Sequence, residues 1–171
     1  MKDKNKINPE LIKKFKKICE VSDGIIKSFE KTASICFIFS KNKKFDVIPL
    51  GFKTAEQKEN LRLNLMQQLA KKDLSGYILI FDATCTILDK ETGYREVSDA
   101  ITRTLYTQKD RLQEIVFYKN KKIIKKQKFK TKNVFDNWDL WNNGLKYNDK
   151  NDAAYQKYKK ENPELYKDLP H

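Results

Sequence analysis

The chain has 171 residues, of which 39% are apolar and 35% are charged, and its formal net charge is +13. That length is enough for one domain with a hydrophobic core of its own. No apolar run approaches the ~18 residues of a membrane span, and the charged start MKDKNKINPE lacks the apolar stretch of a signal peptide, so we expect a cytoplasmic protein.

The first predicted element is a long amphipathic helix over residues 9–31. Asn8 can cap it, Pro9 suits the first helical position, and apolar residues then recur at helical spacing. A β-hairpin is predicted next over residues 35–50, because the apolar runs ICFIF and FDVIPL flank the polar turn KNKK.

A second helix is predicted over residues 54–72, where TAEQ forms a capping box and leucines recur on one side. Residues 77–88 then alternate between apolar and polar side chains. Such alternation is the signature of a long strand with one face in water.

Residues 89–110 are interpreted as a long polar connection. Val97, Ile101 and Leu105 are four residues apart, which predicts one short helix inside it. The runs LQEIVFY and KIIKKQKF follow on either side of KNK, and they predict a second hairpin.

These elements predict an α+β domain over residues 1–132, in the order α-β-β-α-β-β-β. Neighbouring strands are joined by turns, so we expect a mainly antiparallel five-stranded sheet with both helices on one face. Residues 133–171 are polar and aromatic with few aliphatic side chains, which predicts a C-terminal extension without a core of its own.

The stretch FDATCTILD resembles the first motif of the haloacid dehalogenase superfamily, where a strand ends in an aspartate nucleophile and a threonine follows four residues later. Asp82 and Thr86 match that spacing, and Thr84 stands where most of these phosphatases have a second aspartate. The resemblance implies a magnesium-dependent phosphoryl transfer in which Asp82 attacks phosphorus. Asp149 and Asp152 would be the further metal ligands.

This alternative requires a parallel sheet with Asp82 at the C-terminal end of a strand, whereas the sequence predicts hairpins. Cys85 also replaces the usual small glycine of the motif. We therefore favour a simpler interpretation, in which Asp82, Thr84 and Thr86 form the solvated face of a strand, with no catalytic residue and no metal. We interpret the nearby acids in the same way, as a solvated loop and not a divalent-metal site: Asp82, Asp89, Glu91, Glu96 and Asp99.

The densest charge lies in residues 119–132, which contain eight lysines and no acid. A two-stranded ribbon can lie along a nucleic-acid groove, where lysines contact phosphates without reading sequence. Tyr118 and Phe129 could stack on bases if they are exposed. The predicted contact residues are Arg111, Lys119, Lys121, Lys122, Lys125, Lys126, Lys128 and Lys130.

Two alternatives to nucleic-acid binding stay open for this hairpin. Lysines also protect edge strands against aggregation, and the same patch suits an acidic protein surface. Only four basic residues of the chain are arginine, the side chain favoured for specific phosphate and base contacts, so the net charge overstates the evidence for specific binding.

The extension contributes Trp138 and Trp141, which either cover the domain itself or anchor a partner, since tryptophan is enriched at interface hot spots. The only histidine is His171, which argues against histidine-dependent catalysis and most catalytic zinc sites. Three scattered cysteines predict reduced thiols. No cofactor is expected.

The strand GYILIFDA, a polar loop and KDRLQEIVFY, which begins near Asp110 and Arg111, look similar to small uncharacterised α+β proteins of phages and mobile elements. That resemblance implies no particular activity. We therefore expect a non-enzymatic accessory protein that binds nucleic acid or an acidic protein, with a phosphoryl-transfer enzyme using Asp82 as the alternative.

Overall fold

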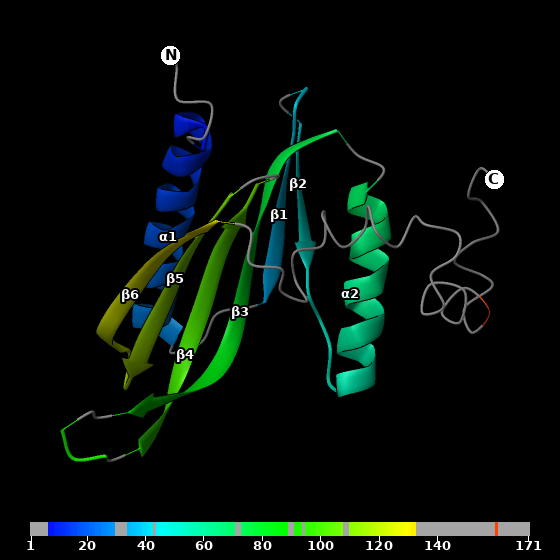
Figure 1. Cartoon of the computed structure of the whole chain (residues 1–171). Coiled ribbons are helices and arrows are strands. Elements are labelled where there is room, and N and C mark those ends of the chain that lie inside the picture. The colour runs from blue at the N-terminus through cyan, green and yellow to red at the C-terminus, as the bar shows by residue number, and fades with distance from the viewer. Residues whose placement is uncertain are drawn as a thin grey trace. The chain divides into compact units, whose positions relative to one another are not determined.

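A computed structural model describes residues 7–29, 34–42, 44–70, 73–88, 91–93, 95–107, 110–132 and 160 (Figure 1). The α+β class is confirmed. The elements in chain order are α1 (Pro9–Phe29), β1 (Ile35–Ser40), β2 (Phe45–Pro49), α2 (Ala55–Ala70), β3 (Leu74–Leu88), β4 (Arg95–Tyr106), β5 (Asp110–Lys119) and β6 (Lys122–Lys132). Of these, α1 and the six strands belong to one compact unit and α2 belongs to a second, so each unit is described by itself.

The strands form one sheet in the order β2-β1-β3-β4-β5-β6, and every neighbouring pair is antiparallel. The antiparallel sheet is as predicted, but it has six strands instead of five. The error lies at β4, where we predicted a short helix. Val97, Ile101 and Leu105 are spaced by four, and residues four apart share a face in a strand as well as in a helix, so that spacing did not separate the two.

Helix α1 begins as predicted, because the Asn8 side chain accepts a hydrogen bond from the Glu10 N–H at 2.9 Å. It packs on one face of the sheet, beside β5 and β6 in the view of Figure 1. The core there joins its apolar side to inward residues of the sheet: Leu11, Phe15, Cys19 and Ile26 with Phe39, Ile78, Ile80, Ile101, Leu105, Val116 and Tyr118.

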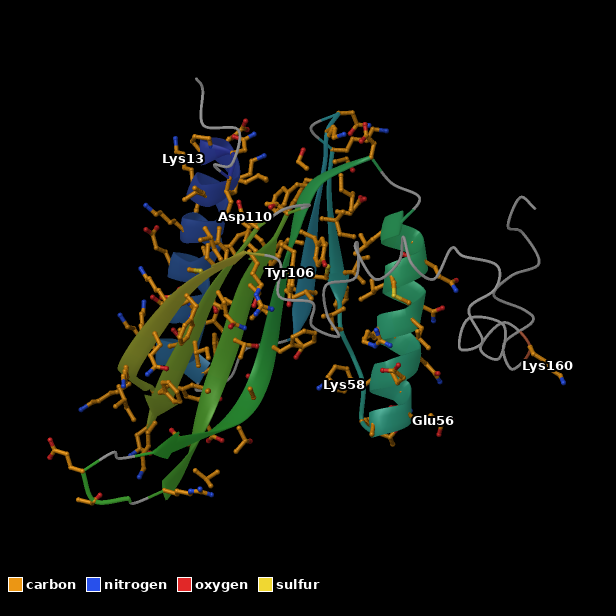
Figure 2. The ribbon with its side chains drawn as sticks, viewed as in Figure 1. Lys13, Glu56, Lys58, Tyr106, Asp110 and Lys160 are labelled. Atoms are coloured by element: carbon orange, nitrogen blue, oxygen red, sulfur yellow. The ribbon has the colours of Figure 1, made fainter. Side chains whose placement is uncertain are left out.

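The opposite face of the sheet is also apolar at its centre. Tyr77 and Tyr106 are directly opposite each other on β3 and β4, and their rings stack with centroids 4.9 Å apart. Both are buried, as is Leu79 in the same strand. Figure 2 marks Tyr106 where β4 ends and Asp110 where β5 begins. The prediction that β3 has one dry and one wet face is therefore wrong for its first half, and beyond Phe81 the side chains of Asp82 and Thr84 are exposed as expected.

The hairpin of β3 and β4 is longer than its neighbours. β3 pairs with β1 only as far as Ile80, and β4 pairs with β5 only from Ala100 onward. Beyond these points β3 and β4 pair only with each other, as far as Leu88 and Arg95. The result is a two-stranded arm that projects from the sheet (Figure 1).

Helix α2 follows the predicted capping box, because the Thr54 hydroxyl accepts the Gln57 N–H at 3.1 Å. Leu65, Met66 and Leu69 are buried, as expected for the inward stripe. That both helices share one face of the sheet stays a prediction. Neither helix in the described part of the chain is long and apolar enough to cross a membrane.

Candidate functional site

The lysine-rich segment forms the predicted hairpin, with β6 at the edge of the sheet. Its turn consists of Asn120 and Lys121, whose φ angles are +50° and +60°. Two consecutive left-handed residues are typical of a type I′ turn, which matches the twist of the two strands. Lys119 and Lys122 are paired across this turn, so the turn places three lysines at one tip.

The register separates the remaining lysines between the two faces. Lys125 lies opposite Phe117 on the face away from α1, whereas Lys126 lies opposite Val116 on the α1 face. The register shifts between Phe117 and Tyr118, which leaves Ile124 as an extra residue in β6 and 60% exposed. The exposed lysines of the tip, here called the tip cluster, are Lys119, Lys121, Lys122 and Lys125.

The two aromatic residues expected to stack on bases behave differently. Tyr118 is buried in the core under α1, so the exposure that stacking on a base requires is not met at this residue. Phe129 is 41% exposed and remains available. Lys128 is also exposed, and Arg111 is half-buried. The Lys130 side chain, Trp138 and Trp141 lie outside the described residues.

Lys126 has a partner that the sequence did not reveal. Its ammonium pairs with one carboxylate oxygen of Asp23 on α1, and the other oxygen accepts a hydrogen bond from Arg103 on β4 at 2.6 Å. This joins the lysine-rich edge to the helix through one carboxylate. Lys126 therefore contributes to the packing of α1, unlike the tip cluster.

Arg103 is the centre of this charged group and is fully buried. Its Nη1 donates to the Cys19 carbonyl at 3.0 Å and lies 3.6 Å from the carboxylate of Glu114, which is directly opposite in β5. A buried guanidinium needs such partners because desolvation of a charge is costly. Its Nε has no hydrogen-bond partner.

Two pKa values are shifted in this cluster, by burial in one case and by hydrogen bonds in the other. Burial raises the pKa of the Cys19 thiol to about 12, which keeps it protonated and unreactive. Burial also acts to raise the pKa of Asp23, but hydrogen bonds from Lys126 and Arg103 outweigh it and hold the pKa below its usual 3.8. Asp23 therefore stays ionised at neutral pH.

A groove of about 500 Å³ lies between α1 and the β5–β6 hairpin, directly over this cluster. Its apolar wall includes Phe15 and Phe129, and Lys16, Lys128 and Glu114 are among its charged lining residues. The mixture of charges gives this groove no clear preference for an anion, in contrast to the tip cluster.

The predicted catalytic residue lies in a different place. Asp82 is exposed in the middle of β3, opposite Ile101, where the two-stranded arm begins. Because β3 is antiparallel to both neighbours, the parallel-strand position that phosphoryl transfer requires is not present at Asp82. Thr84 is exposed beside it, as the simpler interpretation predicted.

The remaining proposed metal ligands cannot be placed with Asp82. The Thr86 side chain, Asp149 and Asp152 lie outside the described residues. Among the residues that are described, no three His, Cys, Asp or Glu side chains are grouped to hold a metal ion. The chain matches no protein-family model, no curated protein and no solved structure.

Proposed function

We propose that this protein is a non-enzymatic binding protein whose partner is a polyanion, with nucleic acid as the favoured class, and that the tip of the β5–β6 hairpin is the contact surface. The observation that carries this proposal is the tip cluster. Four exposed lysines lie within seven residues, and no acid occurs between Ile115 and Lys132. Lysines in such an arrangement attract phosphates without reading sequence.

The form of the hairpin supports contact with a nucleic-acid backbone. A tight two-residue turn leaves the tip narrow, and antiparallel ribbons of this kind can enter a groove. Ile124 and Phe129 are exposed apolar side chains among the lysines of β6. Phe129 offers a face on which an unpaired base could stack, which favours single-stranded over double-stranded nucleic acid.

Lys126 is set apart from this function. Its ion pair with Asp23 and its place over the buried Arg103 give it a structural role. A variant that removes Lys126 would therefore disturb the packing of α1 together with any binding. The test of function uses the tip cluster alone.

The test is a fluorescence-anisotropy titration of labelled single- and double-stranded DNA and RNA, at about 50 and 200 mM salt. The triple variant Lys121→Gln, Lys122→Gln, Lys125→Gln removes three charges at the tip. We expect it to weaken binding and to lower the slope of log K against log salt by about 2 to 3.

The matched control removes the same charge elsewhere, as Lys13→Gln, Lys17→Gln, Lys27→Gln on the exposed side of α1 (Lys13 is marked in Figure 2). It is expected to bind nearly as wild type. Equal weakening by both triple variants would show attraction by net charge alone. No binding to any nucleic acid at low salt would refute the nucleic-acid proposal and leave an acidic protein surface as the partner.

A further inference from the structure

Among the residues that the structure describes, no strand pairs with the outer side of β2 or β6, and these two edges differ in how their backbone is protected. β6 has the sequence KIIKKQKFKTK, and its lysines discourage pairing with another strand. β2 has the sequence FDVIP, with no lysine, and its Phe45 and Val47 side chains are 54% and 44% exposed. The β2 edge therefore lacks the lysines that protect the β6 edge, and its protection is limited to its short length and to Pro49 at its end.

The hydrogen bonds of the first hairpin show which backbone groups of β2 face this open edge. Ser40 N–H donates to the Lys44 carbonyl at 3.0 Å, and Leu50 N–H donates to the Ser34 carbonyl at 2.9 Å. Residues whose backbone groups bond to β1 alternate along β2 with residues whose backbone groups point away from it, so the even-numbered residues of β2 bond to β1. The odd-numbered residues, Phe45, Val47 and Pro49, direct their backbone groups outward.

An apolar groove of about 320 Å³ lies beside this edge, between α1 and the strands β1 and β3. Val21 and Ile25 of α1 and Phe37 of β1 are part of its lining. The Phe45 ring of β2 stacks on that of Phe37, with centroids 6.1 Å apart. Eight large apolar side chains are exposed in the described ranges, and five of them belong to α1 and β2: Val21, Ile25, Phe29, Phe45 and Val47.

We propose that the protein forms a two-fold symmetric dimer in which β2 pairs antiparallel with β2 of a second copy. Val47 then lies opposite Val47 of the second copy, and Phe45 lies opposite Pro49. This register uses both outward N–H donors of each strand, Val47 to the Val47 carbonyl and Phe45 to the Pro49 carbonyl. Pro49, which has no N–H, occupies an outward position where no bond within the chain is lost.

The distribution of charge favours a second copy of this chain as the partner that pairs with β2. Lys44 and Asp46 give residues 44–49 no net charge, whereas the chain as a whole carries +13. Two copies that meet at β2 place their lysine-rich β6 edges at opposite ends of a joined sheet, roughly 50 Å apart at ~4.8 Å per strand. That separation far exceeds the Debye length of ~8 Å at physiological salt. An acidic partner, in contrast, would be attracted to β6.

The dimer would also join the two apolar grooves. A two-fold axis perpendicular to the sheet keeps α1 of both copies on the same side, so the grooves meet across the new seam. Phe45 and Val47 lose water there, and removal of apolar surface from water favours association.

The experiment is sedimentation velocity of the full chain at micromolar concentrations, in 150 and 500 mM salt. We expect a species of twice the 20.3 kDa of one chain. Its share should change little between the two salts, because the lysine-rich edges of the two copies are separated by far more than the Debye length in both. Nucleic-acid binding should weaken with the same change, so the two proposals can fail separately.

Two variants locate the interface. Val47→Lys places a charge at the edge, and Val47→Pro removes an outward N–H without removing a bond to β1. Both should sediment as monomers with unchanged far-UV circular dichroism. The matched control is Ile124→Lys, which adds the same charge at an exposed apolar position of the other edge and should stay dimeric.

Three results would overturn the dimer. They are a wild-type monomer in both salts, a Val47→Lys variant that still dimerises, or an open-ended assembly in place of a closed pair. If Val47→Pro fails to fold, Val47→Lys alone decides the question. A monomeric wild type that still binds nucleic acid would refute the dimer and leave the proposed function intact.

Discussion

Removal of one charge from the buried cluster under α1 gives the most direct test of its energetic role. Asp23→Asn keeps the shape of the side chain and an oxygen that can accept the Arg103 hydrogen bond, but removes the negative charge. In the wild type, Arg103 and Lys126 are balanced by Asp23 and Glu114. In the variant the cluster carries one uncompensated positive charge next to a guanidinium that is fully buried.

The expected cost is about 3 kcal/mol, at the lower end of what removal of one partner from a buried ion pair costs. The lower end applies because the Asp23 side chain is 16% exposed and Glu114 remains near Arg103. For a chain of this length that cost corresponds to a decrease in Tm of about 6 to 12 °C. Urea unfolding at pH 7, followed by circular dichroism, measures the free energy directly.

The control is Asp99→Asn, which removes the same charge from an exposed position on β4. Its effect should stay within about 0.5 kcal/mol of wild type. If Asp23→Asn costs no more than this control, the contacts of Asp23 do not hold α1 on the sheet, and the assignment of Lys126 to a structural role is wrong as well.

Three further predictions follow from single positions. The pKa of Asp23 is lowered in the folded protein, so the ionised carboxylate stabilises the fold fully above pH 3.8, and this stabilisation is lost as the pH falls through the lowered pKa. The free energy of unfolding in urea should therefore decrease less between pH 7 and pH 3 in Asp23→Asn than in the wild type. Gly76→Ala should destabilise the fold by about 1 to 3 kcal/mol in the same assay, because the added Cβ would lie 2.7 Å from the Tyr106 carbonyl oxygen. Gly24→Ala should stabilise the fold by about 1 kcal/mol, because nothing lies within 4 Å of its added Cβ and alanine favours the helix α1. The Cys19 thiol, with its pKa raised to about 12, should react with iodoacetamide at pH 8 only after unfolding in urea, and mass spectrometry of the peptide that contains it would reveal any earlier labelling.

Much of the fold could be predicted because local signals agreed with tertiary structure. The caps at Asn8 and Thr54 start helices, and both hairpins form around the expected turns. β4 was missed because its inward face is interrupted by Arg103, which hides the alternation that a strand usually shows. The β-branched residues Thr102 and Thr104 between its inward positions were a signal for a strand, but the spacing of its apolar residues outweighed it.

The candidate site was predictable only in part. The apolar runs on either side of KNK predicted the hairpin, and the run of lysines marked it as the densest charge in the chain. The separate role of Lys126 could not be predicted, since its partner Asp23 is 103 residues away in the chain and meets it only after α1 packs on the sheet. Arg103 gave no signal in the sequence beyond its charge, although burial makes it the most constrained side chain of the cluster.

The bond between Arg103 and the Cys19 carbonyl also has a consequence for synthesis of the chain. The two residues are 84 positions apart, which a ribosome covers in roughly 4 to 17 s at 5 to 20 residues per second. The strands from β3 to β6 are successive hairpins and can pair as each emerges, because contacts between neighbours in sequence form fastest. Helix α1 is made first but completes its packing late, so during these seconds its apolar side is a surface that a chaperone can bind.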